Sequence, residues 1–253
     1  MRLLAVVTLM GLFCVPGRAE DCPGNPHALG TSRVLEVDAA ATPRVGRKQF
    51  EQTLPLEPKE VVLTFDDGPW PATTPRVLDA LRHECVRATF FLVGRNAAAA
   101  PALVRREQAE GHTIASHTWS HPMLDRRYPE SAEGEIERGI AAVDAALGRR
   151  NGPAPTTRFF RFPGFASTPQ LLDLLARRGI VVFGADLWAS DWDPMTPSQE
   201  LRLVLDRLEA ADHGIILLHD TKAATAAMLP AFLRALKIRG YHIVHTVPAA
   251  PAH

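Results

Sequence analysis

Short apolar runs alternate with amphipathic segments over most of the chain. Val61–Asp66 is a short run with strand character, and Pro75–His83 after it has apolar residues at helical spacing. The other predicted strands are Ala88–Gly94, Thr113–His117, Phe159–Pro163, Val181–Asp186, Gly214–Asp220 and Tyr241–Val247. The other predicted helices are Pro101–Glu110, Ser131–Gly148, Pro169–Arg178, Pro197–Ala210 and Ala223–Leu236. Strands that alternate with helices in this way predict an α/β fold with a parallel sheet.

Polar residues gather at the ends of successive predicted strands. Barrels of alternating strands and helices place their active sites at the carboxyl ends of the strands. We therefore expect a (β/α) barrel with about seven parallel strands in a single domain. An open, doubly wound sheet is the alternative, and it would lack a ring of strand ends that converge on one point.

The first residues have the pattern of an export signal. Arg2 precedes the apolar run Leu3–Val15, and Gly17 and Ala19 then form a small-x-small cleavage pattern. The run is too short to span a bilayer, and no later segment is long enough either. We expect residues 1–19 to be a cleaved signal peptide, which leaves an exported protein, periplasmic or secreted, with no membrane anchor.

Residues 20–58 are rich in Pro, Gly and Ala and are predicted to form an extended N-terminal arm. Removal of the signal peptide leaves two cysteines, Cys22 and Cys85. In an oxidising compartment they could form a disulfide that ties the arm to the domain, or remain two separate thiols.

Composition narrows the class of partner only a little. Lys plus Arg and Asp plus Glu both number 28, so the chain lacks the basic field of a nucleic-acid-binding protein. With 46% hydrophobic and 22% charged residues, it has the balance of an ordinary globular domain. We expect no nucleic-acid partner and a monomer.

Two candidate metal-binding motifs follow the first and third predicted strands. Asp66 and Asp67 begin a Gly-Pro turn, where one carboxylate can bind a metal while the other accepts a proton. An ordinary Asp-Gly turn is the alternative. His117 and His121 are four residues apart, so both imidazoles can reach one ion. Two histidines and a carboxylate suit Zn²⁺, although Co, Ni or Mn also accept such ligands.

Three further motifs stand at later strand ends. Arg161 can hold a carboxylate with its planar fork of donors, and His219 ends an apolar strand. Asp186 and Asp191 could each orient a histidine. Trp188 and Trp192 beside them offer flat faces to a sugar ring or are ordinary core residues.

Together these motifs resemble the polysaccharide deacetylase family. TFDDGP, HTWSH, RFPG, SDW and LLHD occur in the family's order over residues 60–247. The resemblance implies a distorted (β/α) barrel over residues 59–248. It also implies a metal-dependent enzyme that removes N-acetyl groups from the amino sugars of a glycan such as peptidoglycan or a chitin-like polymer.

The resemblance also implies a role for each residue. Asp66 matches the catalytic base and Arg161 its partner, and His219 matches the general acid. The metal ligands would be Asp67, His117 and His121. Leu217 matches a residue that receives the acetyl methyl group, and Asp191 matches the acid that tunes the catalytic histidine.

One position departs from the family pattern. The fourth motif usually has another Asp three residues before its last one, and here that position is Trp188. Asp186 lies two residues earlier and could replace it, so either Asp186 or Asp191 could tune His219. Two other functions stay open, an acetyl-ester deacetylase acting on xylan and a non-catalytic glycan-binding relative.

Overall fold

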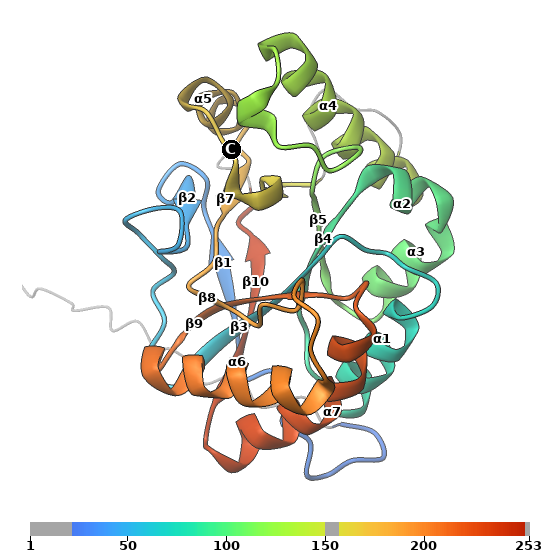
Figure 1. Cartoon of the computed structure of the whole chain (residues 1–253), viewed down its shortest axis with the longest axis vertical. Coiled ribbons are helices and arrows are strands. Elements are labelled where there is room, and N and C mark those ends of the chain that lie inside the picture. Colours follow the sequence, from blue (N-terminus) through green and yellow to red (C-terminus); the bar gives the residue numbers. More distant parts are fainter. Residues whose placement is uncertain (1–21, 150–156, 251–253) are drawn as a thin grey trace, which may run out of the picture.

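The computed structural model describes residues 22–149 and 157–250. The expected signal peptide, residues 1–19, lies outside this part of the chain. Within it, no helix is both long and apolar enough to cross a membrane. In Figure 1 the strands lie at the centre and helices surround them, with α6 and α7 below, α1 to α3 on the right and α4 and α5 at the top.

Ten strands form one sheet in the described residues, and all of their pairings are parallel. The strands are β1 (Arg33–Val37), β2 (Arg44–Val45), β3 (Glu60–Asp66), β4 (Thr89–Leu92), β5 (Thr113–Ser116), β6 (Phe159–Phe160), β7 (Val181–Phe183), β8 (Leu187–Trp188), β9 (Gly214–His219) and β10 (His242–Pro248). The helices are α1 (Thr74–His83), α2 (Gly94–Ala99), α3 (Pro101–Ala109), α4 (Pro129–Ala146), α5 (Pro169–Arg177), α6 (Pro197–Ala211) and α7 (Ala223–Ile238). Two short 3-10 helices, η1 (Leu124–Arg126) and η2 (Pro163–Phe165), complete the set. The predicted α/β fold with parallel strands is confirmed.

The sheet curves into a barrel that hydrogen bonds do not close. Strands β8, β9, β3, β4, β5, β6 and β7 follow one another in space, but no pairing joins β7 to β8 in the described residues. The N-terminal arm contributes β2, which extends the sheet beyond β7. Asp186 lies at this opening and accepts hydrogen bonds from the backbone N–H groups of Arg47 and Ile215 and from the Thr53 hydroxyl. Its carboxylate thus links the arm to β9 where strand pairing is missing.

Strand β3 shows how the sequence sets the two layers of the core. All seven of its residues are buried, because β4 and β9 flank it and helices cover its outer face. Leu63 and Phe65 pack in the layer between strands and helices, whereas Val62 packs in the barrel interior. Alternation along the strand therefore directs Thr64 and Asp66 inward as well. The acid at the end of the strand is held at the mouth of the interior.

Several elements were not predicted from the sequence. Strands β1 and β2 lie in the arm that was expected to be only extended, and β1 pairs with β10. Helix α2 begins at Gly94, and the two-residue strand β8 pairs with β9. The arm is tied down further by a disulfide between Cys22 and Cys85, with a Cα–Cα distance of 5.7 Å. Of the two alternatives for these cysteines, a disulfide or two separate thiols, the structure shows the disulfide.

Two buried histidines lie away from the strand ends that carry the motifs. His112 accepts a hydrogen bond from the Ala88 N–H on Nδ1, and Nε2 of His245 lies 2.9 Å from the Thr113 hydroxyl. That hydroxyl donates its proton to the Thr246 carbonyl, so His245 is the donor in the second contact. Burial lowers the pKa of His112 to about 3 and that of His245 to about 4, with smaller contributions from neighbouring positive charges.

Stability is therefore expected to fall as the pH drops below about 6.5, the usual pKa of an unfolded histidine. Both groups have depressed pKa values in the folded protein, so the unfolded chain binds protons first. Each histidine should cost about 2 kcal/mol of unfolding free energy between pH 7 and pH 5. Urea unfolding at the two pH values measures the loss. His245→Gln keeps a donor but cannot titrate, so it should lose about 2 kcal/mol less; an equal loss in both proteins would contradict this prediction.

Candidate active site

Backbone hydrogen bonds hold the turn that contains Asp66 and Asp67, so both carboxylates are free to point inward. The Asp67 N–H donates to the Phe91 carbonyl, and the Asp67 carbonyl accepts from the Asn96 side chain. Asp67 has φ of +76°, a conformation that costs energy in a residue other than glycine and is common at functional sites. A Cβ on Gly68 would lie 2.2 Å from the Asp220 carboxylate, so only glycine fits this turn.

Asp67, His117 and His121 form the one group of potential metal ligands found among the described residues. Their ligand atoms lie within 4.8 Å of one another. Nε2 of His121 lies 3.2 Å and Nε2 of His117 lies 3.7 Å from Oδ1 of Asp67. Oδ1 of Asp67 is buried and has no hydrogen-bond partner. A buried carboxylate oxygen without a partner fits a site for a cation.

Neighbouring groups fix the orientation of the two imidazoles. His117 donates from Nδ1 to the Arg161 carbonyl at 2.7 Å, which leaves the Nε2 lone pair directed at Asp67. Burial lowers the pKa of His117 to about 3, so it is neutral, as a metal ligand must be. The loop before His121 is anchored to α4, because Glu135 accepts from the backbone and the hydroxyl of Ser120. A Cβ on Gly139 would lie 2.5 Å from Thr118, so glycine lets α4 approach this loop.

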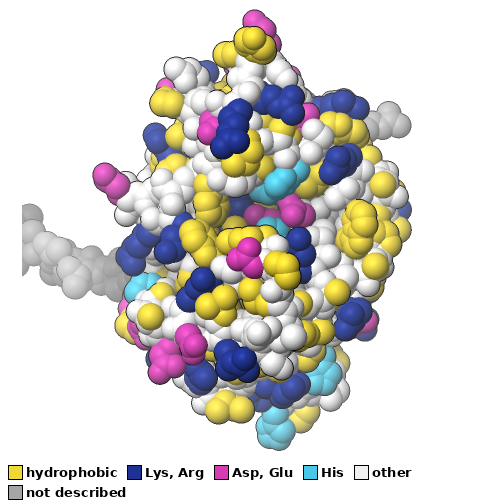
Figure 2. All heavy atoms as spheres, viewed as in Figure 1, with side chains coloured by type: hydrophobic (Ala, Val, Ile, Leu, Met, Phe, Trp, Pro, Cys, Tyr) yellow, Lys and Arg dark blue, Asp and Glu magenta, His cyan; other side chains and the backbone are white. Residues whose placement is uncertain are grey.

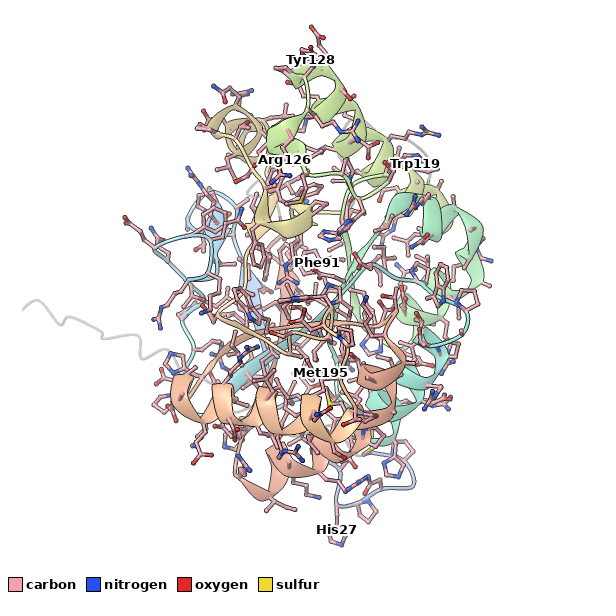
Figure 3. The ribbon with its side chains drawn as sticks, viewed as in Figure 1. His27, Phe91, Trp119, Arg126, Tyr128 and Met195 are labelled. Carbon is pink, nitrogen blue, oxygen red and sulfur yellow. A yellow bond between two sulfur atoms is a disulfide. The ribbon has the colours of Figure 1, made fainter. Side chains whose placement is uncertain are left out.

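Asp66 and Arg161 form a buried ion pair beside the ligand group. Arg161 Nη1 lies 2.6 Å from Oδ1 of Asp66, and the guanidinium also donates to the Thr64 hydroxyl and to the carbonyls of Phe183 and Gly184. Burial raises the pKa of the Asp66 carboxyl, and the positive charge of Arg161 acts in the opposite direction. The guanidinium also stacks 4.2 Å from the Phe91 ring, which Figure 3 shows near the centre of the barrel.

His219 faces the same group and is held by Asp191. Nδ1 of His219 lies 2.7 Å from Oδ1 of Asp191, and the His219 backbone N–H donates to Oδ2 of the same carboxylate. Nε2 of His219 lies 3.9 Å from Oδ2 of Asp67. Burial would lower the pKa of His219, but the Asp191 hydrogen bond and the charges of Asp191, Asp66 and Asp67 outweigh it and raise the pKa to about 9. The interactions with these carboxylates thus favour the protonated form of His219.

The structure separates the two candidate acids of the fourth motif. Asp191 contacts His219, whereas Asp186 bonds to the arm and to β9 and has no contact with the histidine. Trp188 and Trp192 pack together with ring centroids 5.8 Å apart, and Trp192 contacts the His219 ring at 6.0 Å. Trp119, from the second motif, lies elsewhere: it stacks under Arg138 of α4 and lies to the right of the barrel in Figure 3.

These groups line a cavity of about 380 Å³. Its described lining residues are Asp66, Asp67, His117, His121, Phe162, Gly164, Phe165, Trp188, Trp192, Leu217, His219 and Lys222. Figure 2 shows histidine and acidic side chains in the middle of this face, with hydrophobic side chains beside them. All of the predicted site residues except Arg161, Asp186 and Asp191 line the cavity, and Arg161 and Asp191 support it from behind.

Three contributors were missed from the sequence. Phe165 stacks 6.2 Å from Trp188, Lys222 lines the cavity, and Lys48 of the arm lies 4.9 Å from the Trp188 ring. The RFPG motif pointed to the neighbourhood of Phe165, and LLHD to that of Lys222. Nothing in the local sequence of Lys48 indicated a place at the site.

Comparisons with known proteins show the family to which the chain is related. The profile of the polysaccharide deacetylase family matches residues 53–183. A peptidoglycan-N-acetylglucosamine deacetylase, PgdA of Listeria monocytogenes, is 36% identical over 186 residues, covering 74% of this chain and 38% of that protein. This chain thus spans well under half the length of the Listeria relative.

Two further relatives match more of their own length. A chitooligosaccharide deacetylase of Bradyrhizobium is 35% identical over 205 residues, or 75% of this chain and 90% of that protein. The solved structure of the Bdellovibrio bacteriovorus peptidoglycan deacetylase Bd3279 superposes with a TM-score of 0.76 at 30% identity, over 87% of this chain and 59% of that one. On the family profile and these relatives, the chain belongs to the polysaccharide deacetylase family.

Proposed function

We propose that the chain is a divalent-metal-dependent hydrolase that removes N-acetyl groups from the amino sugars of a glycan and releases acetate. One observation carries the proposal: a three-residue ligand group lies between a buried Asp–Arg pair and an Asp–His pair at the mouth of one cavity. Such a set provides a base, a metal site and an acid within reach of one substrate. Residues 59–248 would form the catalytic domain.

Asp67, His117 and His121 would hold the metal ion. Two imidazole nitrogens and one carboxylate oxygen suit Zn²⁺ and leave coordination positions open, and Co, Ni or Mn accept the same donors. When bound, a divalent ion polarises a carbonyl and lowers the pKa of water.

The protein's own groups would move the protons. Asp66 would accept a proton from the attacking water, while Arg161 keeps its carboxylate oriented. His219 would protonate the departing sugar amine, because an amide nitrogen cannot leave as an anion. Because the pKa of His219 is raised to about 9, its imidazole would carry that proton at neutral pH.

The cavity walls would position the sugar. Leu217 lines the cavity one strand residue away from the buried Leu218 and is placed to receive the acetyl methyl group. Trp192 is half exposed, and with Trp188 it offers aromatic faces to a sugar ring.

Asp191 would tune His219, and this role can be separated from that of Asp186. Asp191→Asn should lower the pKa of His219, so the alkaline limb of the kcat pH profile should move down by about one to two units. Asp186→Asn should leave the profile in place but reduce unfolding free energy by about 1–3 kcal/mol, because an amide cannot accept all three bonds of the carboxylate. An unchanged profile in Asp191→Asn would count against the assignment.

The function itself is tested by acetate release from chitin oligomers and from peptidoglycan by the mature chain. Each reaction is run with a chelator and with added Zn²⁺ or Co²⁺. Metal-dependent acetate release from either glycan supports the proposal. Acetylated xylan is assayed in parallel: release from xylan alone would show an ester deacetylase, and a folded protein that releases nothing from any of the three glycans would be a binding relative.

We also propose that the protein is exported, acts in the periplasm or outside the cell, and is a monomer. The relatives named for peptidoglycan support a location outside the cytoplasm. Cell fractionation of the full chain, with the N-terminal sequence of the mature protein, tests cleavage after residue 19.

A further inference from the structure

The cavity contains one lysine that the proposed chemistry does not use. Lys222 lines the wall just after His219, immediately before helix α7, and is half buried. Its ammonium group has no hydrogen bond or ion pair with any residue in the described part of the chain. A partly desolvated ammonium with no protein partner is available to a charged group of a ligand.

A second lysine lies beside the cavity, against Trp188. The ammonium of Lys48 lies 4.9 Å from the Trp188 ring, and it too has no carboxylate partner among the described residues. The backbone N–H of Lys48 donates to the Ala185 carbonyl, and the next residue, Gln49, bonds to the Phe165 carbonyl. The arm is therefore fixed where it contributes Lys48, which makes a cation–π contact with the wall.

The other charged groups that line the cavity have assigned partners or roles. Asp66 is paired with Arg161 and His219 with Asp191, and Asp67 faces the imidazoles with which it would hold the metal ion. Arg126, which lies above Phe91 in Figure 3, is 3.9 Å from Asp125.

Two charged groups lie close to the tryptophan wall. Arg207 donates to the Trp188 carbonyl and the Ser190 hydroxyl behind it. Asp193 follows Trp192 but is exposed to solvent and does not line the cavity. Lys222 and Lys48 are thus two cations beside the cavity that have no carboxylate partner among the described residues.

A neutral acetamido glycan can accept hydrogen bonds from these lysines but has no negative charge with which they could form an ion pair. We propose that Lys222 and Lys48 select glycans with a carboxylate on a substituent or on a sugar next to the acetamido sugar that reacts. This inference rests on the proposed deacetylase function and names its substrate class. Peptidoglycan strands carry such carboxylates on N-acetylmuramic acid wherever no stem peptide is attached, and polysaccharides with uronic acids carry them on the neighbouring sugar.

The experiment compares three substrates of similar length. They are a neutral N-acetylglucosamine oligomer, a peptidoglycan strand of alternating N-acetylglucosamine and N-acetylmuramic acid, and an oligomer of alternating N-acetylglucosamine and glucuronic acid. The measured quantity is the ratio of kcat/KM for each acidic glycan to kcat/KM for the neutral one. Lys222→Gln and Lys48→Gln are compared with Lys237→Gln, which removes one positive charge at the far end of α7.

The ratio is expected to exceed one in the wild type and to fall roughly three- to tenfold in Lys222→Gln. Lys48→Gln should lower it less, because Lys48 is exposed, and Lys237→Gln should leave it at the wild-type value. The acidic glycan with the higher ratio identifies which sugar provides the carboxylate. If Lys222→Gln lowered kcat/KM equally for neutral and acidic glycans, the proposal would be overturned. The lysine would then act on the acetamido group or on the reaction itself, and not on a neighbouring carboxylate. Absence of acetate from all three glycans would instead refute the deacetylase function.

Discussion

Replacing Asp66 by Asn is expected to reduce kcat for acetate release by about 10²–10⁴-fold, because the site loses the carboxylate proposed to accept the proton. The carboxylate is buried at 2% exposure and pairs with Arg161 at 2.6 Å. An amide of the same shape fills that space but cannot accept a proton. Steady-state kinetics with a chitin oligomer measures the loss, which should appear in kcat rather than in KM.

The same substitution leaves the buried Arg161 without its counter-charge, so a loss of folding must be distinguished from a loss of chemistry. Breaking a buried ion pair costs about 3–5 kcal/mol. Thermal unfolding of the variant shows how much protein remains folded at the assay temperature. Because Asp66 is not one of the proposed ligands, folded Asp66→Asn should still bind one divalent ion per chain. A folded, metal-bound variant with more than a tenth of the wild-type kcat would exclude Asp66 as the base.

The core of the site was predictable because its residues occur in short motifs at strand ends. Asp66 ends a buried strand and Asp67 follows it, and His117 and His121 lie in the one loop after β5. Parallel strands bring their carboxyl ends to one edge, so four of the key side chains converge without further information.

The choice between Asp186 and Asp191 could not be made from spacing alone. The predicted strand Val181–Asp186 ends at Phe183, and a second short strand, Leu187–Trp188, begins after the irregular segment 184–186. In this irregular segment the side chain of Asp186 points toward the N-terminal arm. The turn at Ser190, with φ of +58°, directs Asp191 toward His219. Both outcomes depend on hydrogen bonds between distant segments, which no local pattern encodes.

The N-terminal arm is the largest difference between expectation and structure. Its composition predicted only an extended segment, yet Val45 is completely buried and β2 pairs with β7. Lys48 reaches Trp188 across 140 positions of sequence, so its place beside the cavity follows from tertiary structure alone.

Removal of the metal ion is expected to abolish acetate release, and removal of one ligand should prevent its recovery. Chelator-treated wild type should regain activity with Zn²⁺ or Co²⁺, because Asp67, His117 and His121 remain in place. His117→Ala loses the most buried of the three ligands, at 2% exposure, and should bind the ion at least about 100-fold more weakly. Equilibrium dialysis measures the affinity, and the rise in melting temperature on adding the ion measures it independently.

His112→Gln is a suitable control for His117→Ala. His112 is also buried, at 6% exposure, but lies outside the ligand group. Its loss should lower stability while leaving metal affinity and reactivation at wild-type levels. If chelated wild type stayed active, or if His117→Ala recovered fully with the ion, the ligand group would not hold the catalytic metal. The Asp66 and His117 variants together therefore separate proton acceptance from metal binding. Asp66→Asn should bind the metal ion but not catalyse the reaction, and His117→Ala should keep the proposed base but bind the metal ion weakly.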